Sequence, residues 1–254
     1  MHATEKVSET SPPIKLPSPF REEPMLSNND FYLKFDDADR IMDPSYFPPE
    51  IVQFLHDEKV HLTRILAQEK YDCIVEVGCH SGHNAEWLAE LCEHYVGIDI
   101  NLVAIERALG ARGQPGRIDF FCESVENLQQ LLGSERKYFK RKLVLFPFNL
   151  FGNFTNNEEL IGLLDMSGVD LAMSNFNVLA ATTVGRYKYY SNCFGLERVR
   201  VYDAEQGVLF KVGNHFRSIA YRTTYLTKLV SDISRYHGVI TPFSAYGNLI
   251  LLSN

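Results

Sequence analysis

Short apolar runs alternate with amphipathic stretches along residues 49–177. The apolar runs predict strands over 73–77, 95–100, 118–122, 143–148 and 169–175. Apolar residues at helical spacing predict helices over 49–70, 84–94, 102–111, 125–132 and 157–166. Because each pair of parallel strands needs a long crossover, this alternation predicts an α/β fold with a parallel sheet and helices on both faces.

The regular alternation ends after residue 177. A polar, aromatic segment at 182–195 comes first, and β-like stretches at 198–203, 207–211 and 215–221 follow it. A helix is then predicted over 223–237, and strands over 239–243 and 248–253. Strands this close in sequence pair in antiparallel fashion, so the sheet is expected to end in a hairpin.

Two segments precede the first predicted helix. Residues 1–27 are rich in proline and polar residues, and we expect a flexible tail there, with a PxxP ligand as an alternative. Residues 28–48 place aromatic side chains among acids, and prolines exclude a long helix. This arm is expected either to pack on the domain edge or to close over a ligand site as a lid.

Composition narrows the class of protein. The chain has 254 residues and a net charge of −7, which disfavours general binding to nucleic acid. No apolar run is long enough for a membrane span, and the N-terminus lacks the pattern of a secretory signal. The five cysteines are scattered and form no CxxC pair, so a reduced, cytoplasmic protein is expected.

A glycine-containing loop carries the strongest chemical signal. The predicted strand at 73–77 runs into Gly78, and Gly82 stands four residues further on, before a predicted helix. Open parallel sheets bind ligands beyond the carboxyl ends of their strands. Asp99 ends the next predicted strand, where a carboxylate can accept hydrogen bonds from a ribose diol. The G-x-x-x-G spacing disfavours a dinucleotide-binding protein, because G-x-G-x-x-G is the spacing typical of that class.

The stretch EVGCHSG resembles motif I of the class I S-adenosylmethionine (SAM)-dependent methyltransferases, and VGIDIN and FFCESVENL resemble the segments that follow it. The resemblance covers roughly residues 50–254. It departs at His80, which replaces the middle glycine, and at Ser124, where an acid often contacts adenine. It implies a cofactor, SAM, with S-adenosylhomocysteine (SAH) as product, held by Glu76, Gly78, Cys79, His80, Gly82, Asp99, Ile100, Glu123, Ser124, Val125 and Phe148.

The resemblance also implies an architecture. It predicts a seven-stranded, mostly parallel sheet with helices on both faces, a C-terminal antiparallel β-hairpin and a small α+β insert. The SAM-binding core is then 49–177, the insert at 178–222 is a substrate cap, and 223–254 supply the last helix and the hairpin. A metal is not expected, because His80 and His83 lack a third ligand of suitable spacing.

Candidates for the acceptor site follow the fourth predicted strand and lie in the insert and the arm. Aromatic faces can hold a cationic or planar substrate, although a buried hydrophobic loop is the alternative at 148–154. The arginines of the insert can bind a substrate carboxylate or pair with nearby acids. The predicted catalytic residues are Asn149, Tyr190 and His215, and the predicted substrate contacts are Tyr32, Phe35, Phe151, Asn153, Asn177, Arg186 and Arg217.

These features predict a SAM-dependent methyltransferase that acts on a small polar or amine-bearing molecule. No nucleic-acid or membrane partner is expected, and a homodimer is compatible with the aromatic-rich composition. Three alternatives remain at this stage. They are a protein or peptide methyltransferase, a non-catalytic SAM-binding partner protein, and an NAD(P)-dependent oxidoreductase.

Overall fold

The computed structural model describes residues 28–34, 36–111, 116–133, 139–232 and 236–253. Seven strands form one sheet in the order β3-β2-β1-β4-β5-β10-β9. Neighbouring strands among β1–β5 are parallel, whereas β10 runs antiparallel to both β5 and β9. The predicted fold is confirmed. The strands are β1 (Tyr71–Val77), β2 (Cys92–Asp99), β3 (Ile118–Cys122), β4 (Lys142–Phe146), β5 (Asp170–Phe176), β9 (His237–Pro242) and β10 (Gly247–Ser253).

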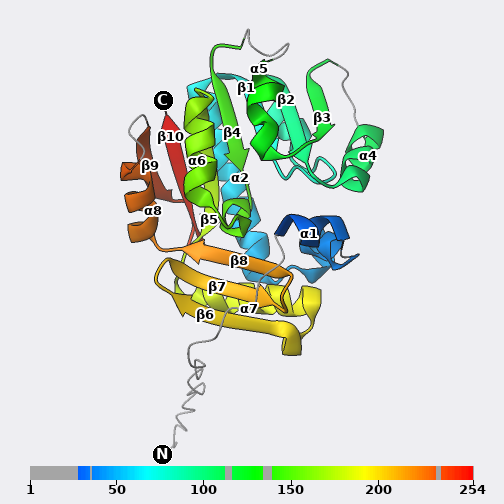
Figure 1. Ribbon diagram of the computed structural model, residues 1–254, viewed down its shortest axis with the longest axis vertical. Helices are drawn as coiled ribbons and strands as arrows, with labels where there is room; N and C mark the ends of the chain where they lie inside the picture. The colour runs from blue at the N-terminus through cyan, green and yellow to red at the C-terminus, as the bar shows by residue number, and fades with distance from the viewer. Residues whose placement is uncertain (1–27, 35, 112–115, 134–138, 233–235, 254) are drawn as a thin grey trace, which may run out of the picture.

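Helices cover both faces of this sheet (Figure 1). Side chains alternate along each strand, so β1 sends Val75 to one hydrophobic cluster and Ile74 to the other. The cluster around Val75 is closed by α5 (Leu128–Gly133), α6 (Asn157–Met166) and α8 (Thr223–Ser231). The cluster around Ile74 is closed by α2 (Pro49–Glu69), α3 (Ala85–Ala89) and α4 (Leu102–Ala111).

The insert and the arm lie together at the carboxyl ends of the parallel strands (Figure 1). They share a third hydrophobic cluster, in which Phe31 of the arm is fully buried against Phe194 and Phe216 of the insert. The arm consists of α1 (Asn28–Lys34) and the 3₁₀ turns η1 (Asp36–Met42) and η2 (Pro44–Tyr46). The insert consists of α7 (Ala180–Phe194), η6 (Leu196–Arg198) and an antiparallel sheet of β6 (Val199–Ala204), β7 (Gly207–Val212) and β8 (Phe216–Tyr221).

Several predicted boundaries were wrong, and tertiary contacts explain them. The helix predicted over 84–94 ends at Ala89, because residues from Cys92 onward pair with β1 and the Arg117 guanidinium binds the carbonyl oxygens of Ala89 and Cys92. The strand predicted over 143–148 ends at Phe146, before a proline. The helix predicted over 223–237 is shorter, because His237 already belongs to β9.

Two short elements occupy loops that follow the strands. The turn η3 (Val125–Asn127) leads from β3 into α5, in the place where a short helix was predicted. The turn η5 (Leu150–Asn153) follows β4 and packs closely against β8. At Gly152 a Cβ atom would lie 2.1 Å from the carbonyl oxygen of Ile219 and 2.5 Å from the side-chain nitrogen of Asn149. The contact between η5 and β8 therefore requires glycine at this position.

We expect Gly152→Ala to destabilise the protein by roughly 1–3 kcal/mol, because the added methyl group overlaps backbone that cannot move without separating η5 from β8. Gly162→Ala is the matched control. Gly162 is exposed in α6, and a methyl group added there would meet nothing within 4 Å, so alanine should stabilise the helix by up to about 1 kcal/mol. Urea unfolding measures both, and equal midpoints would contradict the expectation.

Candidate cofactor and acceptor site

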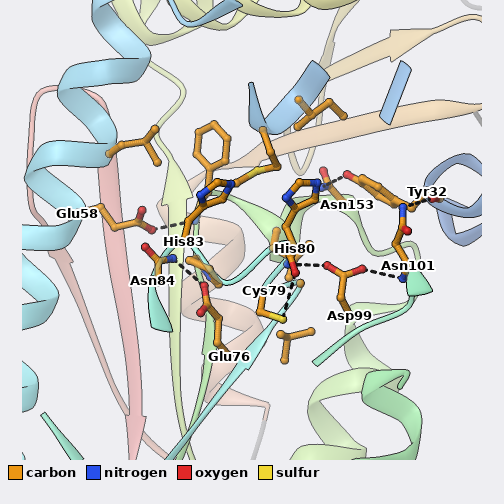
Figure 2. A pocket seen from close by; sticks show the side chains of 18 of the residues that line it. Tyr32, Glu58, Glu76, Cys79, His80, His83, Asn84, Asp99, Asn101 and Asn153 are labelled. Atoms are coloured by element: carbon orange, nitrogen blue, oxygen red, sulfur yellow. Dashed lines mark hydrogen bonds between the residues drawn. The ribbon is translucent and has the colours of Figure 1, made fainter. Parts of the chain in front are cut away.

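A cavity of about 500 Å³ lies at the carboxyl ends of β1, β2 and β4. Loops that follow these strands form its floor, and α2, the arm, α7 and β8 contribute its walls. Figure 2 shows polar side chains from the floor and from the arm directed into this space. Its volume is in the range that accommodates small organic ligands.

The loop after β1 is held in a tight turn. Gly78, His80 and Gly82 all have positive φ angles, of 68°, 49° and 80°. A side chain at Gly82 would also overlap the Phe120 ring, which lies 2.8 Å from the position of a Cβ atom. The amides of Gly78 and Cys79 donate to the carbonyl oxygen of Ile98, at 2.8 and 3.1 Å. The loop is therefore fixed against β2, with its backbone facing the cavity.

Asp99 ties the loop after β1 to the loop after β2. Its Oδ2 accepts a hydrogen bond from the His80 amide and its Oδ1 accepts one from the Asn101 amide, both at 2.9 Å. Burial raises the pKa of Asp99, and the two amides oppose that effect. Each carboxylate oxygen can accept more than one hydrogen bond, so Asp99 can also receive hydroxyl donors from a ligand in the cavity.

Glu76 is a buried carboxylate on β1. Its Oε1 accepts a hydrogen bond from Asn84 Nδ2 at 2.7 Å, and its Oε2 accepts one from the Tyr95 hydroxyl. Burial raises its pKa to about 7, and the nearby charge of Asp99 acts in the same direction. A cationic ligand group beside Glu76 would stabilise the ionised form and relieve this cost.

Glu58 is a second buried carboxylate, and sequence reasoning missed it. It lies on α2, lines the cavity and accepts a hydrogen bond from the Phe148 amide at 2.8 Å. Burial raises its pKa to about 7, with the charge of Glu76 as a further cause. A signal existed in the sequence, because Glu58 interrupts the apolar stripe of α2 that is formed by Ile51, Leu55, Leu62 and Leu66.

The arm is attached to loops that follow three strands. The Tyr32 hydroxyl accepts a hydrogen bond from Asn153 Nδ2 at 2.9 Å, and its carbonyl oxygen accepts one from Asn101 Nδ2 at 3.2 Å. Asp39 contacts His80 Nε2 at 3.3 Å and Arg107 Nη1 at 3.1 Å. Of the two alternatives for the arm, these contacts favour a cover over the cavity. Phe35, a predicted substrate contact, lies outside the described residues, as does the predicted tail at 1–27.

The structure brings most of the predicted site residues together. From the predicted acceptor site, Tyr32, Asn153 and Tyr190 line the cavity. Gly82 shapes the loop without lining the cavity. The cofactor candidates that do line it are Glu76, Gly78, Cys79, His80, Asp99, Ile100, Glu123, Ser124, Val125 and Phe148. Their binding roles remain predictions.

Asn149, a predicted catalytic residue, is fully engaged elsewhere. Its side-chain amide donates to Ser218 Oγ at 3.2 Å and to the carbonyl oxygen of Ile219 at 3.1 Å. Its side-chain oxygen accepts from the Phe176 amide at 2.9 Å. Asn149 is buried and does not line the cavity, so its position supports a tie between β5, η5 and β8 and not a contact with a substrate.

Arg186, a predicted substrate contact, is completely buried within the insert. Its guanidinium donates to the carbonyl oxygens of Val208 and Ser218, at 3.2 and 3.0 Å, and lies 4.4 Å from the centre of the Phe210 ring. Among the described residues of the insert, no acidic side chain pairs with it, and it does not line the cavity. The prediction failed because the sequence does not show that this arginine faces the interior of the insert.

Four further candidates also lie outside the cavity lining. His215 stacks on Phe31, with 6.0 Å between ring centres, and Phe151 is fully buried in the core. Asn177 accepts hydrogen bonds from the Leu179 amide and the Thr182 hydroxyl at the start of α7. Arg217 lies on β8 and does not line the cavity. These positions supply packing or capping and do not place the side chains against a substrate in this cavity.

The described ranges hold two histidines close together on the loop after β1. The imidazoles of His80 and His83 stack, with 5.7 Å between their centres, and no group of three His, Cys, Asp or Glu side chains there is arranged for a metal ion. Among the described helices, none combines the length and the apolar character needed to cross a membrane.

Comparison with known proteins identifies the domain. Residues 74–151, from β1 to the turn after β4, match the family model described as a methyltransferase domain. This segment is therefore similar to a methyltransferase domain. The matched segment contains Glu76, the glycine loop and Asp99. No curated protein sequence matches the chain.

Solved structures extend the similarity to the whole methyltransferase fold. The plantazolicin methyltransferase BpumL, in complex with SAH, is 15% identical, with a TM-score of 0.55 over 90% of this chain and 94% of that one. Magnesium protoporphyrin IX methyltransferase (ChlM) from Synechocystis PCC 6803, with bound SAM, is 13% identical, with a TM-score of 0.52 over 92% and 100%. A complex of DhpI with SAM and HEP gives 10% identity and a TM-score of 0.56 over 92% and 100%. The chain therefore has the class I SAM-dependent methyltransferase fold.

Glu58 makes the stability of this methyltransferase domain depend on pH. Its pKa is about 7 in the folded state and near 4.5 in an unfolded chain, so the folded state retains a proton that the unfolded state releases between these values. This contribution is fully present below pH 4.5 and is lost as the pH rises through 7. We expect Glu58→Gln to raise the stability at pH 8 by up to about 3 kcal/mol and to flatten the decline from pH 5 to pH 8.

Thermal unfolding of the wild type and of Glu58→Gln at pH 5, 6, 7 and 8 measures the difference in stability between them. Glutamine keeps an oxygen that can accept the hydrogen bond from the Phe148 amide. Glu69→Gln is the control, because Glu69 lies on the same helix with a side chain that is 44% exposed and does not line the cavity. Parallel pH profiles for the wild type and Glu58→Gln would contradict the expectation.

Proposed function

We propose that the protein transfers the methyl group of SAM to a small molecule and releases SAH. One observation carries this proposal. One cavity holds the positive-φ loop after β1, the carboxylate of Asp99 after β2 and further space under the arm and the insert. That arrangement provides for a nucleoside and a second ligand at the carboxyl ends of adjacent parallel strands.

The residues present fit the cofactor. Asp99 is placed to accept the ribose hydroxyls, and Glu76 to compensate the positively charged methionine end. Glu123, Ser124 and Val125 line the same cavity from the loop after β3 and are assigned to the adenine side. When bound, SAM supplies an electrophilic methyl group. The protein then has to orient the acceptor, exclude water and receive a proton where the acceptor needs to lose one.

The position of the arm and the insert over the cavity favours a small acceptor over a protein or peptide. Ile41 and Met42 of the arm and Tyr189 and Tyr190 of the insert line it from above the floor. The Tyr189 hydroxyl donates to the carbonyl oxygen of Ile41, which joins the arm to the insert. An extended peptide would have to separate these two segments. The acidic net charge agrees with an acceptor that is not a nucleic acid.

The acceptor's identity does not follow from the fold. The similar structures include a plantazolicin methyltransferase and a magnesium protoporphyrin IX methyltransferase, which are named after molecules of very different chemistry. Screening a metabolite mixture with methyl-labelled SAM tests the proposal directly, and the label should appear in a small molecule. Binding of SAH without any transfer would favour a non-catalytic SAM-binding protein.

We expect Asp99→Ala to weaken SAH binding by at least tenfold, because the variant loses the ribose acceptor and the tie between the loops after β1 and β2. Isothermal titration measures the affinity. Glu126→Ala removes an exposed carboxylate from the neighbouring turn η3 and should leave the affinity unchanged.

A thermal shift assay provides an independent readout on the same proteins. SAH at about 100 times its dissociation constant should stabilise the wild type by roughly 2.7 kcal/mol, whereas NAD should give no shift. Stabilisation by NAD alone would overturn the proposed cofactor. Unchanged SAH affinity in Asp99→Ala would show that Asp99 does not hold the ribose.

A further inference from the structure

Glu58 has no cationic side chain to balance its charge among the residues that the structure describes. Its surroundings supply the Phe148 amide and the Ser174 hydroxyl, which lower its pKa, and one further carboxylate, Glu76, which raises it. The adjacent Lys59 also lines the cavity, but its Nζ lies over the Trp87 ring, 5.4 Å from the ring centre. A buried carboxylate in this setting gains most from a positively charged ligand group.

The position of Glu58 separates it from the residues assigned to the cofactor. Glu76 is the next-to-last residue of β1 and Asp99 is the last residue of β2, and the glycine loop lies between them. Glu58 is fixed instead to the Phe148 amide, beyond the end of β4, and the next amide, of Asn149, donates to the carbonyl oxygen of Ser174 on β5. Figure 2 shows Glu58 and Asp99 at opposite sides of the pocket, with Glu76 below and between them. Glu58 therefore lies on the β4–β5 side, next to the space left for an acceptor.

Aromatic rings form the wall beside Glu58. The Phe148 ring lies 6.0 Å from Phe47, 5.8 Å from Tyr189 and 5.9 Å from Phe176, measured between ring centres. All four rings line the cavity, and they come from the arm, the turn after β4, β5 and the insert. Aromatic faces bind apolar groups and attract cations. A carboxylate within such a wall matches a ligand with an apolar body and an ammonium group.

We propose that the acceptor is an amine with an apolar or aromatic body, and that Glu58 binds its ammonium group and removes a proton from it. The inference rests on the proposed methyl transfer and names the acceptor class and a catalytic residue for it. Glu58 was not among the predicted catalytic residues, of which Tyr190 and His215 were the candidates to orient or deprotonate the acceptor. Tyr190 is the one of them that lines the cavity, and it is not needed for the proton transfer.

The chemistry balances with the groups present. The acceptor ammonium gives one proton to the Glu58 carboxylate, which leaves a neutral amine with a lone pair. That lone pair forms the new N–C bond while the S–C bond of SAM breaks and its electrons remain on sulfur, giving SAH. The product is an N-methylated ammonium ion, and the proton on Glu58 passes to solvent. A pKa of about 7 allows Glu58 to take up and release this proton near neutral pH.

Other titratable groups around the site are less suited to this role. The hydroxyl of Tyr32 accepts a hydrogen bond from Asn153, and burial raises its pKa, so it stays protonated. His83 lies on the loop after β1, with its Nε2 3.2 Å from Ser81 Oγ, and burial lowers the pKa of His83. The remaining titratable groups that line the cavity near Glu58 are Glu76, His56, Lys59, Tyr189 and Tyr190.

Binding to the SAH-saturated protein tests the proposal without turnover. The probes are benzylamine, 2-phenylethylamine and hexylamine, each compared with the alcohol of the same carbon skeleton. At least one amine should bind the wild type more tightly than its alcohol. Glu58→Gln should weaken the binding of that amine by about 10- to 100-fold, while the affinity for the alcohol should change little. Glu69→Gln, an exposed change on the same helix, should leave every affinity unchanged.

Turnover supplies a second readout. With methyl-labelled SAM and the amine that binds best, Glu58→Gln should lower kcat by about 10²- to 10⁴-fold. Failure of every amine to bind, or an equal preference for the alcohols, would overturn the proposal. A loss of SAH affinity in Glu58→Gln as large as the loss of amine affinity would assign Glu58 to the cofactor and overturn it as well. Absence of SAH binding to the wild type would instead refute the proposed methyl transfer.

Discussion

Burial of carboxylates at one end of the parallel sheet is the constraint on which the site depends. Glu76, Asp99 and Glu58 are withdrawn from water around a single cavity, and burial raises the pKa of each. Backbone amides, one hydroxyl and one side-chain amide compensate part of the cost. The remaining desolvation cost of the ionised carboxylates is not compensated by the protein's own groups. Ligands that carry a positive charge or hydroxyl groups therefore stabilise this end of the sheet more than apolar ligands do.

The arm and the insert make that burial possible. The two segments share a hydrophobic cluster that includes Phe31 of the arm and Phe194 and Phe216 of the insert. Polar contacts then fix the cluster to the floor of the cavity, through Tyr32 with Asn153 and through Asp39 with His80. The arm and the insert are therefore anchored to the same loops that hold the carboxylates. Displacement of the arm would expose these loops and the carboxylates to water.

The sequence predicted the fold correctly, and its cofactor candidates line one cavity, because both depend on local patterns. Strand-to-helix alternation, the glycine loop and Asp99 are visible within short windows. The acceptor side was predicted poorly, because orientation in the insert depends on tertiary packing. Arg186 and Asn149 are polar residues whose partners are backbone groups from distant segments, so residue type alone gave no indication that they are structural.

The position of Glu58 depends both on a local sequence pattern and on tertiary packing. Its place in the apolar stripe of α2 is visible in the sequence, but its partner is set by the end of β4 at Phe146, just before Pro147. After Pro147 the backbone of Phe148 and Asn149 adopts positive φ angles of 48° and 58°, and the Phe148 amide binds Glu58 instead of extending β4. Such backbone conformations are uncommon outside glycine and persist where surrounding contacts hold them. The carboxylate and the turn therefore stabilise one another, which places an acidic group and an aromatic ring side by side at the end of β4.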